Sequence, residues 1–347
     1  MTRNSICILI LLFLAMASKT IFADEDKAKE MKELQIRVKE AQKAFQVKDF
    51  PKAITLLKAI LEKTPNPMFE YNLACAYAQI KNKHQALNHL EKAILLGYIN
   101  VKHIENDPDL ISIRTTPRYS EVIKKAKSML EAQKKIIASI PSPKDILLKP
   151  KKLTVDQKIP LLVFLHGMGG SSKDLEPVFK ILSSSNMYSV LLPCGSVKMG
   201  LRADGNPAYN WDPMKDSKRI IEKIKKMKGI QQDKIYLAGF SAGANMSYVI
   251  GVEAADQLKG VIAFSGAVQN ELMNDKWIKK ASNKLPIYIV HGLNDKMMPI
   301  SLGRNAYDYF KKHDFHVKLK TFQGGHTLPS NYLDIIKDAV EWFHKKK

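Results

Sequence analysis

The sequence predicts two parts, an all-α helical region followed by an α/β region with a doubly wound, mostly parallel sheet. Apolar residues recur at helical spacing between residues 34 and 93. From residue 158 on, short continuous apolar runs alternate with amphipathic stretches, the order that produces a parallel sheet covered by helices on both faces. A length of 347 residues fits two domains, and 45% hydrophobic residues supply a core for each. We place the domains at 24–138 and 139–347, because Pro141, Pro143 and Pro150 interrupt the helical pattern.

In the helical region, apolar positions repeat at a fixed distance along the chain. Ala53 and Leu57 recur 33 residues later as Ala86 and Leu90. This period resembles the tetratricopeptide repeat, a helix–turn–helix unit of about 34 residues. We expect two such units closed by a capping helix over 117–135. The region either binds a peptide or partner protein or packs on the neighbouring domain as a structural appendage.

Six apolar runs after the boundary predict buried parallel strands. They cover residues 158–165, 188–192, 234–238, 260–264, 286–290 and 317–322. Amphipathic stretches between them, such as 219–227 and 302–312, predict the covering helices. Active sites in such sheets lie at the carboxyl ends of the strands, so residues that directly follow these runs are the candidates for catalysis.

The candidate nucleophile is Ser241, in the sequence Gly239-Phe-Ser-Ala-Gly243. It directly follows one predicted strand and precedes a predicted helix, the context in which a G-x-S-x-G serine is held in a strained turn. Such a turn crowds its neighbours, so the positions two before and two after the serine must be small.

The candidate acid and base follow the last two strands. Asp295 comes a few residues after the run 286–290, and His326 comes a few residues after the run 317–322. The order Ser241, Asp295, His326 is that of an α/β-hydrolase triad, in which the histidine takes the serine proton and the acid orients the histidine. Other acids and bases are weaker candidates because none follows a strand end so directly; they are Asp275, Asp314, His313 and His316.

The loop His166-Gly-Met-Gly-Gly170 follows the first strand of the sheet. We nominate the backbone amides of Met168 and Ala242 as the oxyanion hole, because one donor comes from this loop and the other from the residue after the nucleophile. We expect His166 to pack the loop. Trp211 is either a wall of the substrate pocket or a core tryptophan.

With these motifs, the last 200 or so residues resemble the phospholipase/carboxylesterase family of α/β-hydrolases, which includes acyl-protein thioesterases. The resemblance implies hydrolysis of carboxylic esters or thioesters through an acyl-Ser241 intermediate, with a small-molecule or lipid-like ester as substrate and with no metal and no cofactor. In relatives, glutamine often follows the serine directly, and a second glycine often follows the last glycine of the motif. This chain has Ala242 and Ala244 at these two positions. The sequence G-x-S-A-G also resembles secreted polyester depolymerases and feruloyl esterases.

Two other functions remain open from the sequence. A serine peptidase of prolyl-oligopeptidase type uses the same triad, although its N-terminal partner is usually a β-propeller. A non-catalytic binding protein, with the repeats as the working part and an inert hydrolase domain, would be signalled by a lost triad member, and all three are present.

The first 23 residues predict a cleavable signal peptide, with an uncleaved anchor as the alternative. Arg3 supplies the positive end, and the apolar run from Ile6 to Ala17 has 12 residues, short of the roughly 20 that cross a membrane. We expect cleavage after Ala23 and a secreted or periplasmic protein. The mature chain keeps Cys75 and Cys194, which we expect as two separate thiols because they fall in different predicted domains.

The formal net charge of +21 raises nucleic acid and anionic surfaces as partners. The charge is spread along the chain without a known nucleic-acid-binding motif, so we expect no nucleic-acid partner. The densest basic cluster lies in one predicted helix and consists of Lys218, Arg219, Lys223, Lys225, Lys226 and Lys228. It is either a solvated helix face or a weak contact for an anionic membrane or cell-wall polymer.

Overall fold

The computed structural model describes residues 24–150, 157–185 and 187–345. These residues divide into two compact units, one ending at Ala138 and the other beginning at Ser139. The expected signal peptide, residues 1–23, lies outside the described residues, so its cleavage stays a prediction. Among the helices that the structure describes, none combines the length and the apolar character that crossing a bilayer requires.

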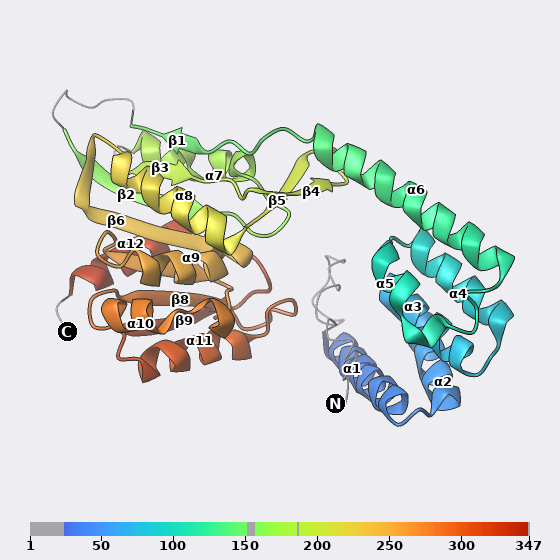
Figure 1. Ribbon diagram of the computed structural model, residues 1–347. Coiled ribbons are helices and arrows are strands. Elements are labelled where there is room, and N and C mark those ends of the chain that lie inside the picture. The colour runs from blue at the N-terminus through green and yellow to red at the C-terminus, as the bar shows by residue number, and fades with distance from the viewer. Residues whose placement is uncertain (1–23, 151–156, 186, 346–347) are drawn as a thin grey trace. The chain divides into compact units, whose positions relative to one another are not determined.

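The first unit is all-α, which confirms the helical region and leaves its repeat type a prediction (Figure 1). Its elements are α1 (Asp24–Gln46), α2 (Phe50–Leu61), α3 (Pro67–Gln79), α4 (Lys83–Leu95), α5 (Val101–Asn106), the 3₁₀-helix η1 (Pro108–Leu110) and α6 (Pro117–Ser139). The turns before α2 and α4 have the same geometry at positions 33 residues apart. Asp49 and Asn82 cap these helices through their side chains, and each follows a lysine with φ of 60°.

The second unit is built on a seven-stranded sheet in the order β1-β3-β2-β6-β7-β8-β9, with β1 antiparallel and the others parallel. The strands of this sheet are β1 (Ile146–Leu148), β2 (Ile159–Leu165), β3 (Ser189–Leu192), β6 (Ile230–Phe240), β7 (Gly260–Phe264), β8 (Ile287–Gly292) and β9 (Val317–Phe322). A separate hairpin pairs β4 (Val197–Leu201) with β5 (Pro207–Asn210).

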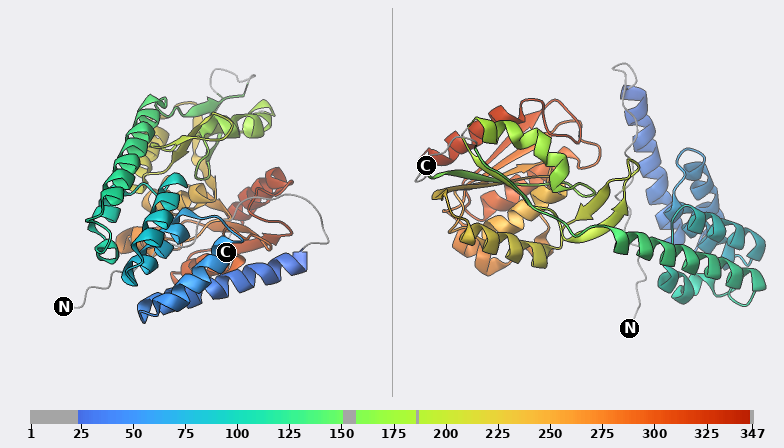
Figure 2. Two further views of the ribbon diagram at one scale, coloured as in Figure 1. Left: turned by 90° about the vertical axis from the view of Figure 1, so that its right-hand side faces the viewer. Right: turned by 90° about the horizontal axis from the view of Figure 1, so that it is seen from above.

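Helices cover both faces of the sheet (Figure 2). One face carries α8 (Pro213–Lys226), α9 (Ala242–Glu253), α10 (Asp275–Ala281) and α11 (Ile300–Lys312), and the other carries α7 (Ser172–Ser184) and α12 (Tyr332–His344). Successive residues of β2 serve the two cores in turn: Val163 packs under α8 and α9, whereas Phe164 packs under α7 and α12. Because both faces of β2 are buried, its sequence is a continuous apolar run. The 3₁₀-helix η2 (Asn270–Leu272) completes the unit.

The predicted parallel sheet is confirmed, and each of the six apolar runs coincides with one of its strands. Three strands were missed. β1 has only three residues and lies between prolines, and the alternating exposed pattern of β4 gives the hairpin no apolar run. The sequence reasoning identified buried strands because they carry the core, and these three strands carry little of it.

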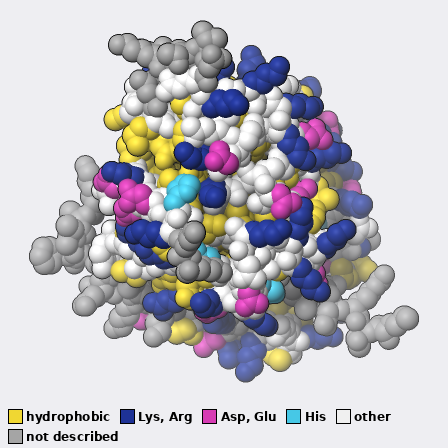
Figure 3. All heavy atoms as spheres, turned by 90° about the vertical axis from the view of Figure 1, so that its left-hand side faces the viewer, with side chains coloured by type: hydrophobic (Ala, Val, Ile, Leu, Met, Phe, Trp, Pro, Cys, Tyr) yellow, Lys and Arg dark blue, Asp and Glu magenta, His cyan; other side chains and the backbone are white. Residues whose placement is uncertain are grey.

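Cys75 and Cys194 are both buried and neither forms a disulfide. The positive charge is dispersed: on the face drawn in Figure 3, Lys and Arg side chains are interleaved with acidic and hydrophobic ones. The basic cluster was predicted in one helix, but α8 ends at Lys226 and Lys228 lies beyond it. Arg219 and Lys223 of this cluster form ion pairs with Asp145. These two cations are therefore engaged within the unit, and contact of the remaining lysines with an anionic surface stays a prediction.

The packing of α9 on β2 leads to a stability prediction. A Cβ at Gly243 would lie 2.2 Å from the Leu165 carbonyl oxygen, which the strand ladder holds in place. Gly243→Ala should therefore lower the free energy of unfolding of this unit by about 3 kcal/mol or more, at the upper end of overpacking costs. Urea unfolding followed by tryptophan fluorescence measures this unit selectively, because all three tryptophans (Trp211, Trp277 and Trp342) lie in it.

The matched control is Gly251→Ala in the same helix. Its Cβ would meet Val261 Cγ2 at 2.7 Å, a clash with a side chain and not with backbone, and alanine gains about 1 kcal/mol in helix propensity. Gly251→Ala should therefore lose less stability than Gly243→Ala. Equal stability of the two variants would contradict the rigid contact at Gly243.

Candidate functional site

Ser241 occupies the turn between β6 and α9. Its φ is 55° and its ψ is −119°, a left-handed conformation that is strained for a residue with a side chain. The Ser241 amide donates a hydrogen bond to the Phe264 carbonyl at 2.8 Å, and its own carbonyl accepts from the Ala244 amide at 2.9 Å. A Cβ at Gly239 would lie 2.2 Å from the Gly243 carbonyl oxygen. These contacts hold the strained turn, and they show why both flanking positions are glycine.

Ser241, His326 and Asp295 form one hydrogen-bonded chain. The distance from Ser241 Oγ to His326 Nε2 is 2.9 Å, and the distance from His326 Nδ1 to Asp295 Oδ2 is 2.7 Å. Each residue follows the carboxyl end of a strand: Ser241 follows β6, Asp295 follows β8 and His326 follows β9. The structure thus brings together three residues that are up to 85 positions apart in the sequence.

The carboxylate of Asp295 is held by the loop that carries it. Its Oδ1 accepts hydrogen bonds from the amides of Met297 and Met298, at 3.0 and 2.7 Å. The fully buried His291 steadies the same loop through a 2.6 Å contact from its Nε2 to the Met298 carbonyl. Burial raises the pKa of Asp295, but the hydrogen bonds from His326 and the Met298 amide outweigh it and hold the net pKa below the usual value. Asp295 therefore remains ionised beside His326.

The loop after β2 forms a tight turn against the nucleophile. Gly170 donates to the Gly167 carbonyl at 3.0 Å, and Gly169 has φ of 79°, which makes Gly167–Gly170 a type II turn with Met168 at its second position. A Cβ at Gly167 would lie 3.5 Å from the Ser241 Cβ, so this turn is in contact with the serine. Within the described residues, the amides of Met168 and Ala242 donate no hydrogen bond, which leaves both N–H groups for a ligand.

Trp211 lies behind this turn and is only 6% exposed. Its ring stacks on His166 with centroids 4.5 Å apart, and its Nε1–H donates to the His166 carbonyl at 2.8 Å. The structure therefore places Trp211 in contact with the loop, while its role as a pocket wall stays a prediction. His166 packs the loop as expected.

The His166 ring is held in one protonation state. Its Nδ1–H donates to the Gly167 carbonyl at 2.7 Å, and its Nε2 accepts from the Gly195 amide at 2.9 Å. Burial lowers the pKa of His166 to about 4 and outweighs the Gly167 hydrogen bond, which acts in the opposite direction. The ring is therefore neutral at neutral pH, and both of its nitrogens are engaged in fixing the loop.

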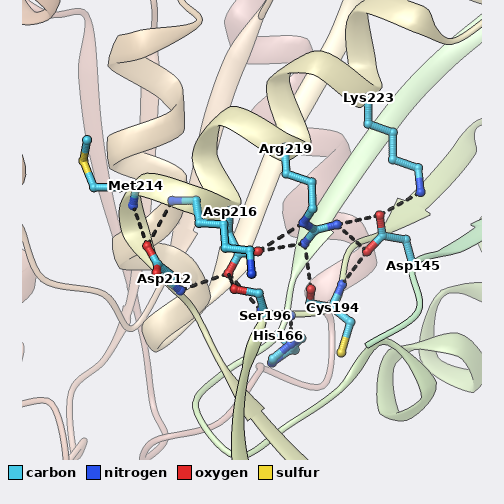
Figure 4. A network of polar contacts seen from close by, with 11 residues as sticks. Asp145, His166, Cys194, Ser196, Asp212, Met214, Asp216, Arg219 and Lys223 are labelled. Carbon is cyan, nitrogen blue, oxygen red and sulfur yellow. Dashed lines mark hydrogen bonds and ion pairs between the residues drawn. The ribbon is translucent and has the colours of Figure 1, made fainter. Parts of the chain in front are cut away.

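A network of two buried carboxylates and two partly exposed cations lies beside this arrangement, on the side of α8 (Figure 4). Asp216 is fully buried, and its carboxylate accepts hydrogen bonds from the Ser196 amide, the Ser196 hydroxyl and the Asp212 amide.

Arg219 links Asp216 to Asp145. Its Nη2 lies 3.1 Å from Asp216 Oδ1, and its Nη1 lies 2.8 Å from Asp145 Oδ2. Burial raises the pKa of Asp145, but Lys223, the Cys194 amide and Arg219 outweigh it and lower the net pKa.

The sequence analysis did not predict the contacts of Asp145, Asp216 and Arg219. One signal was present: Asp216 precedes Ile220 by four residues and Ile224 by eight, so it continues the apolar stripe of α8 and was bound to be buried. Asp145 gave no such signal, because it lies in a proline-rich segment outside any periodic pattern.

The other candidates make contacts outside the hydrogen-bonded chain of Ser241, His326 and Asp295. His313 contacts the Tyr309 carbonyl, and His316 packs on Trp342. Asp275 sits in the first turn of α10. Among the described residues, the one group with metal-ligand spacing is Cys75, Asp107 and Asp109 in the helical unit, where Tyr71 donates to Asp107 at 2.6 Å.

Comparison with known proteins concerns the region that carries the hydrogen-bonded chain of Ser241, His326 and Asp295. The profile of the Phospholipase/Carboxylesterase family matches residues 154–344. Acyl-protein thioesterase 1 of Neurospora crassa is 33% identical over 115 residues, which are 32% of this chain and 47% of that protein, so the match spans about half of that relative. Acyl-protein thioesterase 1 homolog 1 of Dictyostelium discoideum is 26% identical over 206 residues, or 52% of this chain and 88% of the relative. Acyl-protein thioesterase 1 of Kluyveromyces lactis is 27% identical over 210 residues, or 53% and 90%.

The matched region covers more than half of the chain, all strands except β1, and all three residues of the hydrogen-bonded chain. It thus joins the fold and the motifs in one continuous segment. The chain therefore belongs to the phospholipase/carboxylesterase family of α/β-hydrolases.

Proposed function

We propose that the protein hydrolyses carboxylic esters, thioesters included, through an acyl intermediate on Ser241. Family membership supports a serine hydrolase that acts on ester bonds. The observation that carries the residue assignment is the hydrogen-bonded chain from Ser241 Oγ through His326 to Asp295. These are a nucleophile, a base and an orienting acid within direct reach of one another.

In the acylation step, Ser241 Oγ attacks the carbonyl carbon of the ester while its proton passes to His326 Nε2. The ionised Asp295 keeps the Nδ1–H of His326 directed toward itself and stabilises the imidazolium that forms. The negative charge on the carbonyl oxygen is stabilised by the amides of Met168 and Ala242. The intermediate then breaks the bond to the alcohol or thiol, which leaves with the proton of His326.

Deacylation uses the same groups in reverse order. A water molecule gives a proton to His326 Nε2 and attacks the acyl carbonyl, and the same two amides stabilise the second oxyanion. Breaking the acyl–Ser241 bond returns the proton to Oγ and releases the carboxylic acid.

The substrate class is a small-molecule or lipid-like ester. Met168, 45% exposed, presents an apolar side chain beside its own amide and supports an apolar acyl group at this position. With residues 1–23 cleaved as a signal peptide, the enzyme meets its substrate outside the cytoplasm, which argues against cytosolic acyl-proteins. The comparisons support neither the peptidase nor the inert binding protein.

For the helical unit, we infer tetratricopeptide-like repeats with a peptide or protein partner. Two similarities within the chain support the repeats. The turn geometry before α2 recurs before α4, and Ala53 and Ala86 are both fully buried. Small buried residues at equivalent positions let the paired helices approach closely.

The triad assignment predicts the effect of single substitutions on ester hydrolysis. Ser241→Ala and His326→Ala should lower kcat by a factor on the order of 10⁶, and Asp295→Asn by about 10⁴. The assay is hydrolysis of p-nitrophenyl esters from acetyl to palmitoyl, whose chain-length optimum also measures the acyl site.

The matched controls are Asp275→Asn and His313→Ala, which remove the same chemical groups away from the triad. They should keep wild-type kcat. A loss of activity in His313→Ala equal to that in His326→Ala would refute the assignment of the base.

The oxyanion assignment predicts a difference between two substitutions at one position. Met168 is the second residue of a type II turn, where proline is favoured, so Met168→Pro keeps the turn and removes the N–H. It should lower kcat by about 10²–10³ with little change in KM, whereas Met168→Ala keeps the amide and should stay within about 3-fold of wild type. Equal kcat values for these two variants would remove Met168 from the oxyanion hole.

The neutral state of His166 predicts a pH dependence of stability. Because its pKa is about 4 in the folded protein and near 6.5 when unfolded, the unfolded chain binds the extra proton as the pH falls below 6.5, and stability is lost between pH 6.5 and 4. The loss between pH 7 and pH 5 should be roughly 2 kcal/mol in urea unfolding followed by tryptophan fluorescence. In His166→Gln, which cannot titrate, this loss should be smaller by about that amount; an identical loss would show that the pH dependence arises elsewhere.

A further inference from the structure

We propose that Asp145 is a positioning residue for the oxyanion hole, acting through the segment 194–196 and His166. This proposal rests on the proposed function, because it concerns the same site. Asp145 precedes the region that matches the family, which begins at residue 154. It follows α6 by six residues, in the stretch that connects the helical unit to the sheet.

The contacts begin at the peptide unit of Cys194. The side chain of Asp145 is 7% exposed, and its Oδ1 accepts the Cys194 amide at 2.9 Å. Arg219 donates to both oxygens of Asp145 at 2.8 Å and to the Cys194 carbonyl at 2.7 Å. Asp145 thus holds Cys194 directly through its amide and indirectly through the arginine at its carbonyl (Figure 4).

The next two amides carry this constraint to the loop. The Ser196 amide donates to Asp216 at 2.9 Å, so both neighbours of Gly195 are fixed by buried carboxylates. The Gly195 amide in turn donates to Nε2 of His166 at 2.9 Å. His166 Nδ1–H donates to the Gly167 carbonyl, which also accepts the hydrogen bond that closes the turn of Met168. Asp145 is therefore connected to this turn through hydrogen bonds and the peptide link between Cys194 and Gly195.

The same connecting stretch reaches the turn by a second path. Ile140, 2% exposed, packs on Cys194 and Tyr209, and the Tyr209 hydroxyl donates to the Pro141 carbonyl at 3.0 Å. The backbone of Tyr209 exchanges hydrogen bonds with Gly169 and Gly170, at 2.9 and 3.2 Å. Two sets of contacts, which share Cys194, thus tie residues 140–145 to the loop that carries the Met168 amide.

Of the residues in these two paths, Asp145 is the one whose substitution should disturb the loop most, because its charged carboxylate holds the Cys194 amide and Arg219. Removing its carboxylate leaves the Cys194 amide without an acceptor and Arg219 without one of its two carboxylate partners. A shift of about 1 Å in a catalytic group can cost on the order of 100-fold in rate. Because the oxyanion exists only in the transition state and the tetrahedral intermediate, the cost should fall on kcat rather than on KM.

The experiment compares Asp145→Ala and Asp145→Asn with Lys223→Met in the full-length protein. Lys223 contacts the same carboxylate at 2.7 Å but none of residues 194–196, so its loss removes an ion pair and leaves the path intact. Active sites are counted with a fluorophosphonate, so that kcat refers to folded, reactive enzyme. We expect kcat for a p-nitrophenyl ester to fall about 10- to 100-fold in Asp145→Ala and less in Asp145→Asn, with KM within about 3-fold. Lys223→Met should match wild type.

A transition-state analogue separates positioning from a merely structural role. A trifluoromethyl ketone adds to Ser241 and places an oxyanion in the hole, so its inhibition constant should rise by the same factor by which kcat/KM falls. A purely structural loss would reduce the number of titrated sites and leave both constants per site unchanged. Wild-type kcat and inhibition constant per site in Asp145→Ala would overturn the proposal. If that variant does not fold, the same result in the double variant Asp145→Asn, Tyr209→Phe would do so; the second substitution removes the hydrogen bond from the Tyr209 hydroxyl to the Pro141 carbonyl.

Hydrogen–deuterium exchange tests the positioning without activity. Exchange of residues 166–170 and 194–196 should accelerate about 10-fold or more in Asp145→Ala and stay unchanged in Lys223→Met, because freed amides exchange through local opening. Unchanged exchange in Asp145→Ala would overturn the proposal. If the wild-type protein hydrolyses no ester, the proposed function fails, and the exchange result then decides the positioning by itself.

Discussion

The site depends on how closely the start of α9 approaches the end of β2. Backbone atoms of Leu165 and Gly243 meet where no Cβ fits, and the same contact brings the turn of Met168 against Ser241. Ser241 and the nominated oxyanion donors therefore follow two adjacent strands, whose register is set by parallel pairing of Leu165 with Gly239. The left-handed conformation of Ser241 costs on the order of 1–3 kcal/mol, and this packing, together with the hydrogen bond to Phe264, holds it in place.

The buried carboxylates of this unit fall into two groups that differ in their hydrogen-bond partners. Asp295 accepts a hydrogen bond from His326 and orients the base in the proposed mechanism, whereas Asp145 and Asp216 accept hydrogen bonds from the backbone amides of residues 194 and 196. Each of the three is almost completely buried, and a buried charge is tolerated only when hydrogen bonds and opposite charges replace its water. The amides of Met298, Cys194 and Ser196 fill that role. Geometry at this site is therefore maintained by the electrostatic demands of these carboxylates as well as by apolar packing.

Most of the fold and the hydrogen-bonded chain could be predicted because the responsible signals are local. Six continuous apolar runs mark six strands, and Ser241, Asp295 and His326 each follow a strand end, where topology alone brings them together. The short edge strand β1 and the hairpin bury few apolar residues and leave no such signal. The support of His166 also escaped prediction, since it depends on Asp145, Gly195 and Asp216, which meet only after the chain has folded. The proposed roles of Met168 and Ala242 depend on amide directions, which residue types do not encode.

The boundary of the family match and the boundary of the folded sheet do not coincide. β1 precedes residue 154 and pairs with β3, whose four residues are all buried. This short antiparallel strand satisfies the outer backbone groups of an otherwise open edge. A recombinant protein trimmed to the matched region would expose the outer edge of β3, an apolar strand, and this arrangement promotes edge-to-edge aggregation. Residues that precede the matched region thus protect an apolar strand that lies within it.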